Sequence, residues 1–213
     1  MTRASRIVPF AACMLAGCLG LGAQRDRTRF FTLAPLAADQ DNAVPGDETP
    51  LTLGLGPITL PPYLDRMQLV RRTGPNEIGI SATDRWAEAL GYDFTATLRQ
   101  NLVVLLGTSH VVLHPWLRTT RPELAVDIDV LHFEAATSGD VDLTAQWRLR
   151  RVADGTVLIG RTSRVAERAN GGDSDAAVAA LSRALGTFSR EIASAVRAER
   201  ARSPDRRPPR PRA

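Results

Sequence analysis

The 213-residue chain contains no lysine, only two cysteines and only three histidines, and aromatic residues make up 5% of it. The three histidines are too few and too scattered for a zinc site, so we expect no metal and no cofactor. Cys13 lies in a segment that we expect to be removed, which leaves Cys18 as the single cysteine of the mature chain. A disulfide within the mature protein is therefore excluded.

The excess of positive charge lies at the two ends of the chain and not in its middle. The formal net charge is +4, but the first 17 residues contribute +2, and residues 197–213 contribute +5 from seven arginines and two acids. Residues 18–196 therefore carry −3. A basic surface of the kind that binds nucleic acid is not supported, and we expect no nucleic-acid partner.

The N-terminus has a short apolar stretch that ends in a cysteine. Two arginines precede residues 7–15, which are apolar but far shorter than the ~20 residues that a membrane-spanning helix needs. The next residues, Leu15-Ala16-Gly17-Cys18, match the lipobox of bacterial lipoproteins. The alternative is an ordinary secretory signal peptide with an incidental cysteine. We predict a signal peptide over residues 1–17, lipidation of Cys18, and a tether over residues 18–28.

The residue after the lipobox cysteine bears on the destination of the protein. In enteric bacteria an aspartate at this position favours retention in the inner membrane, whereas this chain has Leu19. We therefore expect a lipid anchor in the outer membrane, with the domain facing the periplasm.

Hydrophobic periodicity predicts both strands and helices in residues 29–196. Alternating residues predict a half-buried strand at 51–55, which Gly56-Pro57 interrupts, a hairpin over 68–82 around Gly74-Pro75-Asn76, and a meander of three antiparallel strands between 124 and 166. Ser81 to Asp84 resemble a capping box that opens a helix ending at Gly107. Its apolar face would comprise Trp86, Leu90, Phe94, Leu98, Leu102 and Leu105.

A second long helix should begin after Asp173–Asp175. Its apolar stripe would comprise Val178, Leu181, Leu185, Phe188 and Ile192. Two helices with one apolar face each, together with alternating strands, predict an α+β two-layer sandwich: a mostly antiparallel sheet with both helices packed on one face. We expect one domain over 29–196 and a disordered Arg/Pro-rich tail over 197–213.

The candidate catalytic residues have simpler structural interpretations. Asp127 and Asp129 lie on the same side of one strand, roughly 7 Å apart, a separation that suits paired carboxylates. Acids opposite an apolar strand face are also typical of a solvated sheet surface, which we favour. His110 and His114 have no acid or cysteine in the same segment. We therefore expect no catalytic residues, and a hydrolase that uses the two aspartates stays a minor alternative.

Several segments, in their order, resemble the PqiC (YmbA) family of auxiliary lipoproteins of ABC-type and MCE-type transport systems. After the lipobox, the similar segments are Phe30 to Pro35, Leu53 to Arg66 with its Pro61-Pro62-Tyr63-Leu64-Asp65 run, Leu69 to Arg72, and Asp84 to Leu90. The family usually has a proline in place of Ala89. The resemblance covers the first half of the mature domain, while the second half matches only in its order of strands and helix.

The resemblance implies a non-enzymatic subunit of a machine that moves lipids between the two membranes. Its partners would be an MCE-domain protein and an inner-membrane permease, sometimes with an ATPase; whether it forms a homo-oligomer, such as a ring around a tubular MCE partner, is left open. We expect partner contacts at an exposed Pro61-Pro62-Tyr63 corner, at Arg71, and at Arg85, which would need a partner at the start of a helix. Trp86 is expected in the core. The alternative function is a stand-alone envelope scaffold that binds peptidoglycan or assists outer-membrane assembly.

Overall fold

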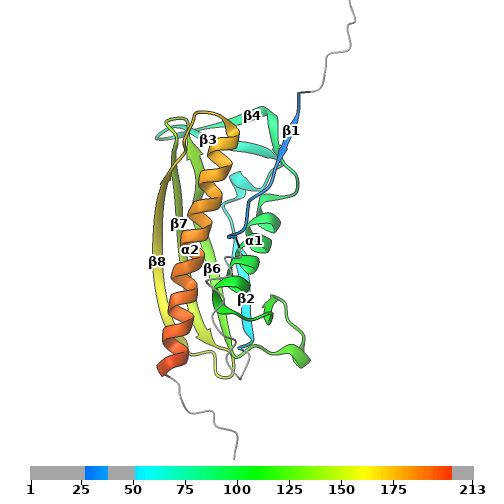
Figure 1. Ribbon diagram of the computed structural model, residues 1–213, viewed down its shortest axis with the longest axis vertical. Coiled ribbons are helices and arrows are strands. Elements are labelled where there is room, and N and C mark those ends of the chain that lie inside the picture. The colour runs from blue at the N-terminus through cyan, green and yellow to red at the C-terminus, as the bar shows by residue number, and fades with distance from the viewer. Residues whose placement is uncertain (1–26, 38–50, 203–213) are drawn as a thin grey trace, which may run out of the picture.

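The computed structural model describes residues 27–37 and 51–202 (Figure 1). The predicted signal peptide and Cys18 lie outside these residues. The strands are β1 (Arg29–Phe31), β2 (Leu53–Thr59), β3 (Gln68–Gly74), β4 (Glu77–Trp86), β5 (Val111–Leu113), β6 (Leu124–Ala136), β7 (Asp140–Arg151) and β8 (Val157–Arg168). The helices are α1 (Leu90–Leu106), α2 (Ser174–Arg202) and the 3₁₀-helices η2 (Pro62–Leu64) and η3 (Arg118–Thr120).

The eight strands form one mixed sheet. Its order is β1-β4-β3-β6-β2-β5. β2 and β3 pair with different parts of the same edge of β6, and β7, followed by β8, extends the sheet from the opposite edge of β6. The long ladders β6–β7–β8 and the β3–β4 hairpin are antiparallel, whereas β1–β4, β2–β5, β2–β6 and β3–β6 pair in parallel. Both helices lie on the same side of the sheet (Figure 1). The α+β class predicted from the sequence is confirmed.

The core lies between the sheet and the two helices. All five residues of the predicted second stripe are buried on α2, which packs across β6, β7 and β8. From the first predicted stripe, Leu90, Phe94, Leu98 and Leu102 are buried on α1, which packs against α2 and β2. Burial of such apolar surface contributes roughly 25 cal/mol per Å². α2 continues to Arg202, so residues 197–202, expected in the disordered tail, extend the helix.

The predicted start of the first helix is wrong. Residues 81–86 continue β4, and α1 begins only at Leu90. The Ser81 hydroxyl accepts hydrogen bonds from the backbone N–H groups of Thr83 and Asp84, as a capping serine would, but it does so within the strand. Pairing of Phe31 with Trp86 and of Gln68 with Arg85 holds this segment extended between two other strands. These distant pairings override the local helix signal.

β2 is buried on both faces rather than on one. Its first four residues, Leu53 to Gly56, are all buried, because α1 covers one side and Trp116 and Pro122 lie against Gly54 on the other. The predicted interruption at Gly56-Pro57 is present as a shift in the β2–β6 register between Leu55 and Ile58. Within the described ranges, no helix combines the length and the hydropathy needed to cross a membrane.

Candidate docking site

The proline corner forms the one-turn helix η2 between β2 and β3. The Leu64 N–H donates to the Pro61 carbonyl at 2.9 Å, and Leu64 is buried beneath the turn. Pro62 is exposed, as predicted. Tyr63, in contrast, is half-buried and packs against the core, and its hydroxyl donates to the Glu134 carboxylate at 2.7 Å. The corner is therefore exposed through Pro62, whereas Pro61 is half-buried and the tyrosine ties the corner to the sheet.

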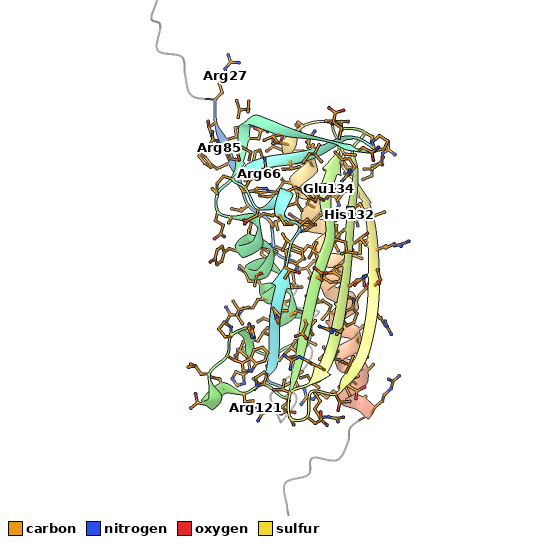
Figure 2. All side chains as sticks on the ribbon, turned by 180° about the vertical axis from the view of Figure 1, so that it is seen from behind. Arg27, Arg66, Arg85, Arg121, His132 and Glu134 are labelled. Carbon is orange, nitrogen blue, oxygen red and sulfur yellow. The ribbon has the colours of Figure 1, made fainter. Side chains whose placement is uncertain are left out.

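Glu134 on β6 is the buried centre of this attachment. Its carboxylate accepts hydrogen bonds from Tyr63, from the Arg72 guanidinium at 2.5 and 2.9 Å, and from the Phe133 N–H at 3.0 Å. His132 Nδ1 lies 3.5 Å away (Figure 2). Burial by itself raises the pKa of Glu134, but the donors from Tyr63, Arg72 and Phe133 outweigh it and hold the pKa below its ordinary value of 4.5. Burial and the bond to Glu134 raise the pKa of Tyr63.

The two arginines predicted to contact a partner differ in their surroundings. Arg71 on β3 donates to the backbone carbonyls of Gly172 and Asp173, so it holds the loop before α2. Arg85 lies on β4 and not at the start of a helix, so the predicted repulsion from a helix end does not apply. The Nε atoms of Arg66, Arg71 and Arg85 are all buried and have no hydrogen-bond partner within the described residues (Arg66 and Arg85 are labelled in Figure 2). Arg71 nevertheless binds the loop before α2 through its terminal nitrogens, and a partner contact at Arg85 stays a prediction.

An apolar groove of about 480 Å³ lies beside the proline corner. Pro62 and Leu64 of η2, the bent part of β2, the first turn of α1 and the end of β5 surround it. Its apolar lining includes Leu55, Ile58, Leu60, Ala89, Tyr92 and Leu113, and its polar lining comprises Asp65, Thr95 and His114. Tyr92 is 75% exposed and Leu113 is 40% exposed, so large apolar side chains face solvent here. The sequence did not single out this groove, because its walls come from four separate segments.

The Asp127–Asp129 pair alternates along β6 with the buried Val126, Ile128 and Val130, so it lies on the side of the sheet opposite the helices, in a broad hollow of about 660 Å³. Arg150 Nε donates to both oxygens of Asp127, at 3.2 and 3.0 Å, and the Thr59 hydroxyl donates to Asp129. An arginine and a threonine on neighbouring strands thus satisfy the two acids, which fits the favoured interpretation as a solvated sheet surface. Among the residues that the structure describes, no group of three or more metal-ligating side chains is present.

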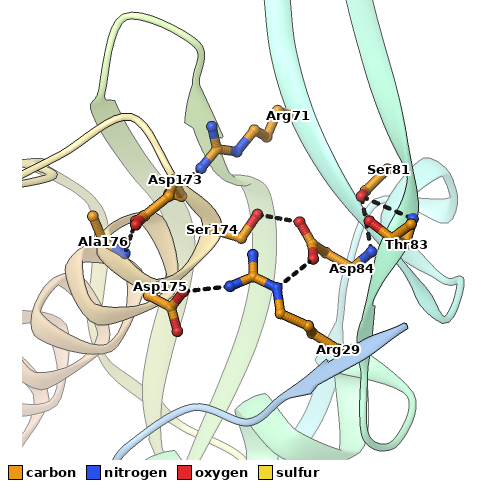
Figure 3. Close-up of polar contacts among 9 residues, drawn as sticks. All are labelled: Arg29, Arg71, Ser81, Thr83, Asp84, Asp173, Ser174, Asp175 and Ala176. Carbon is orange, nitrogen blue, oxygen red and sulfur yellow. Dashed lines mark hydrogen bonds and ion pairs between the residues drawn. The ribbon is translucent and has the colours of Figure 1, made fainter. Parts of the chain in front are cut away.

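A polar junction fixes β1 to β4 and to the start of α2. Arg29 donates to Asp84 at 3.0 Å and to Asp175 at 2.6 Å, and the Ser174 hydroxyl donates to the other oxygen of Asp84 at 2.6 Å (Figure 3). Burial by itself raises the pKa of Asp84, but the hydrogen bonds from Arg29 and Ser174 lower it by more than burial raises it. The pKa of Asp84 is therefore below its ordinary value. The first described strand is therefore joined to two elements far from it in sequence.

Beyond β1 the chain runs as an extended strap, Leu33–Leu36, held by both helices. The Leu33 N–H donates to Asp93 of α1 at 2.8 Å, the Ala34 N–H to Ser182 of α2 at 3.0 Å, and the Leu36 N–H to Asn101 of α1 at 2.7 Å. All three accepting side chains are buried. The strap therefore joins the segment after β1 to both helices.

Comparison with known proteins places this fold. The family model described as ABC-type transport auxiliary lipoprotein component matches residues 31–193. No curated protein matches the sequence. A crystal structure of a Xanthomonas campestris protein of family DUF330 aligns with a TM-score of 0.68 and 16% identity, covering 83% of this chain and 99% of the other.

A second crystal structure, described as that of an uncharacterized protein, aligns with a TM-score of 0.64 and 20% identity, covering 79% of this chain and 98% of the other. At these identities the two structures support the fold alone. The family model, however, spans the domain from β1 to within α2. The chain therefore belongs to the family of ABC-type transport auxiliary lipoprotein components.

Proposed function

We propose that the protein is the outer-membrane-anchored, periplasmic lipoprotein subunit of an MCE-type intermembrane lipid transport system, in which it docks the assembly and does no chemistry. The observation that carries the proposal is the family match over residues 31–193, which covers nearly all of the described domain. The PqiC-like segments from Leu53 to Arg66 and from Asp84 to Leu90 support the assignment to an MCE-type system. The partners would be the MCE-domain protein and the permease.

The anchor in this proposal is Cys18, modified by lipid after cleavage of residues 1–17. A single acyl chain binds membranes only marginally, whereas two or more hold stably at ~0.8 kcal/mol per buried methylene, and a lipobox cysteine carries several. Leu19 supports sorting to the outer membrane. The Arg29 junction and the Leu33–Leu36 strap support a role in which the anchor and the folded domain act as one unit.

The docking role is supported by the surface beside η2. There, an exposed proline and an apolar groove offer contacts to a partner, and the half-buried Arg85 lies on the neighbouring strand. The aspartate pair, in contrast, is occupied by Arg150 and Thr59. These contacts favour a binding subunit over a hydrolase.

Crosslinking in cells tests the proposal. A C-terminally tagged copy would be crosslinked, purified and analysed by mass spectrometry. We expect the MCE-domain protein and the permease to copurify, and we expect Arg85→Glu to reduce their recovery. The matched control is Arg164→Glu, at an exposed position on β8. Recovery of only peptidoglycan or unrelated outer-membrane proteins would show that the transport proposal is wrong and would favour a stand-alone scaffold.

A further inference from the structure

The apolar groove ends at a free strand edge. The Leu53 N–H donates to the His110 carbonyl and the His114 N–H donates to the Leu55 carbonyl, which sets the register of β5 on β2. Because alternate residues of a parallel strand direct their backbone groups to the same neighbour, Val111 and Leu113 face away from β2. No described strand pairs with that side of β5.

Leu113 is the open position on this edge. Arg99 of α1 already donates to the Val111 carbonyl at 2.9 Å, and Val111 is buried. Leu113 is exposed, lines the groove, and directs its N–H and carbonyl groups outward. An added strand would hydrogen-bond to these groups and place alternate side chains against the apolar lining.

The free edge of β8 does not offer the same combination. β8 pairs only with β7, but its exposed residues include Arg161, Arg164 and Arg168, and charged side chains along an edge discourage strand addition. β5 carries no charged residue, and Tyr92 beside it is 75% exposed. Of these two edges, the apolar one is therefore β5.

The groove also carries a negative charge, which favours a positively charged occupant. Asp65 is exposed, contributes to the lining, and forms no ion pair within the described ranges. A basic residue on the occupant would complement it. Two of the chain's remaining segments do not fit: residues 38–50 contain four acids and no base, and residues 203–213 are rich in proline, which lacks the N–H that a strand needs. Residues 19–26 connect the proposed lipid anchor to β1.

We propose that the groove binds an extended segment of a partner protein, which adds a strand to β5, places apolar side chains between η2 and Tyr92, and sets a basic residue against Asp65. The proposal deepens the proposed function and rests on it for the source of the segment, a protein of the transport assembly.

Photo-crosslinking in cells, with the full-length protein, tests the inference. A photoreactive amino acid would replace Leu113, or Val157 at the start of β8 as the matched control, since both are exposed apolar strand residues. We expect the Leu113 probe to crosslink to one partner segment that is extended, apolar and contains a basic residue, and the Val157 probe not to. No crosslink at Leu113, a crosslink to lipid or to a second copy of this chain, or the same product from both positions would overturn the inference.

The two proposals fail separately in this design. Copurification of the MCE-domain protein with a silent Leu113 probe would overturn the groove proposal and leave the transport role. A crosslink from Leu113 to an extended segment of an unrelated protein would retain strand addition and show that the transport role is wrong.

A synthetic peptide copied from the crosslinked segment separates strand addition from simple apolar contact. We expect methylation of the backbone nitrogens that face Leu113 to weaken binding at least tenfold. We also expect Asp65→Asn to weaken binding of the basic peptide at least threefold, and to leave unchanged the binding of a peptide with glutamine in place of the basic residue. Equal binding of the methylated and unmethylated peptides would overturn strand addition.

Discussion

At the scale of single residues, Glu134 joins three elements through one buried carboxylate. Tyr63 brings η2, Arg72 brings β3, and Glu134 itself belongs to β6. A buried carboxylate with this many donors contributes to stability only while they remain, since losing one leaves part of a buried charge unpaired. The proline corner beside the groove is thus held in place by a polar contact that the sequence pattern does not reveal.

Replacing Tyr63 with phenylalanine removes one donor and leaves the ring. We expect Tyr63→Phe to lower the free energy of unfolding by about 1.5–3 kcal/mol at neutral pH, the usual range for a hydrogen bond to a charged group. Urea denaturation measures the change. Tyr92→Phe, which alters an exposed tyrosine, is the matched control and should change the stability by less than about 0.5 kcal/mol.

The pH dependence of unfolding tests Glu134 separately. Because its pKa is lower in the folded protein than its ordinary 4.5, its contribution is present above about pH 4.5 and is lost as the pH falls through the lower folded value. We expect Glu134→Gln to be less stable than the wild type at pH 7 and to lose less stability between pH 5 and pH 3. Parallel stability curves for the two proteins would contradict this assignment.

The pKa of Asp93 is shifted in the opposite direction to that of Glu134. Burial raises its pKa above the ordinary 3.8, and the Leu33 N–H offsets this only in part. Its contribution to stability is therefore full below about pH 3.8 and declines as the pH rises through the folded pKa. We expect Asp93→Asn, which keeps an acceptor for Leu33, to match or exceed the wild type at pH 7. Asp93→Leu should lose about 1–3 kcal/mol. A large loss in Asp93→Asn by urea denaturation at pH 7 would refute this account.

At the scale of elements, local pattern predicted what depends on local contacts. The three-strand meander and the buried stripe of α2 follow directly from periodicity. Trp86 lies in the core, as expected, but on a strand and not on a helix. Its spacing of four residues from Leu90 is also typical of a helix, which explains the wrong element. The sequence did not predict the strap. Asp93 and Asn101 are polar residues buried on α1, and their role becomes visible only when the backbone N–H groups of Leu33 and Leu36, far away in sequence, are seen to donate to them. Such contacts between remote segments are outside the reach of a local pattern.

The tight packing around Gly54 on β2 can be tested by substitution. A Cβ atom at Gly54 would lie 2.8 Å from Pro122 Cγ and 2.9 Å from a ring carbon of Trp116, whereas a Cβ at Gly160 on β8 meets nothing within 4 Å. We expect Gly54→Ala to destabilise the protein by about 1–3 kcal/mol through overpacking, and Gly160→Ala to be neutral or slightly stabilising. Thermal and urea unfolding of the two variants make the comparison. Equal effects would mean that β2 tolerates a shift of its neighbours.

At the scale of the whole molecule, the proposed anchor and the position of β1 together set an orientation. β1, the end of β4 and the start of α2 meet at one end of the domain, while the β7–β8 turn and the end of α2 lie at the other (Figure 1). The eight residues between Cys18 and Arg27 reach at most about 30 Å. α2 has 29 residues and is therefore about 43 Å long. The β1 end should then face the membrane that holds the lipid.

Energy transfer from a bilayer-surface dye measures this orientation in vesicles that carry the lipidated protein. With Cys13 removed and the Cys18 sulfur alkylated, one label would be attached at Thr83→Cys on β4, and the other at Ala153→Cys in the β7–β8 turn, both exposed positions. We expect higher transfer at position 83, because the tether joins the domain at its β1 end and is shorter than the domain is long. Equal transfer at the two positions in the unaltered protein would show that the domain rotates freely on its tether and that its β1 end does not face the membrane.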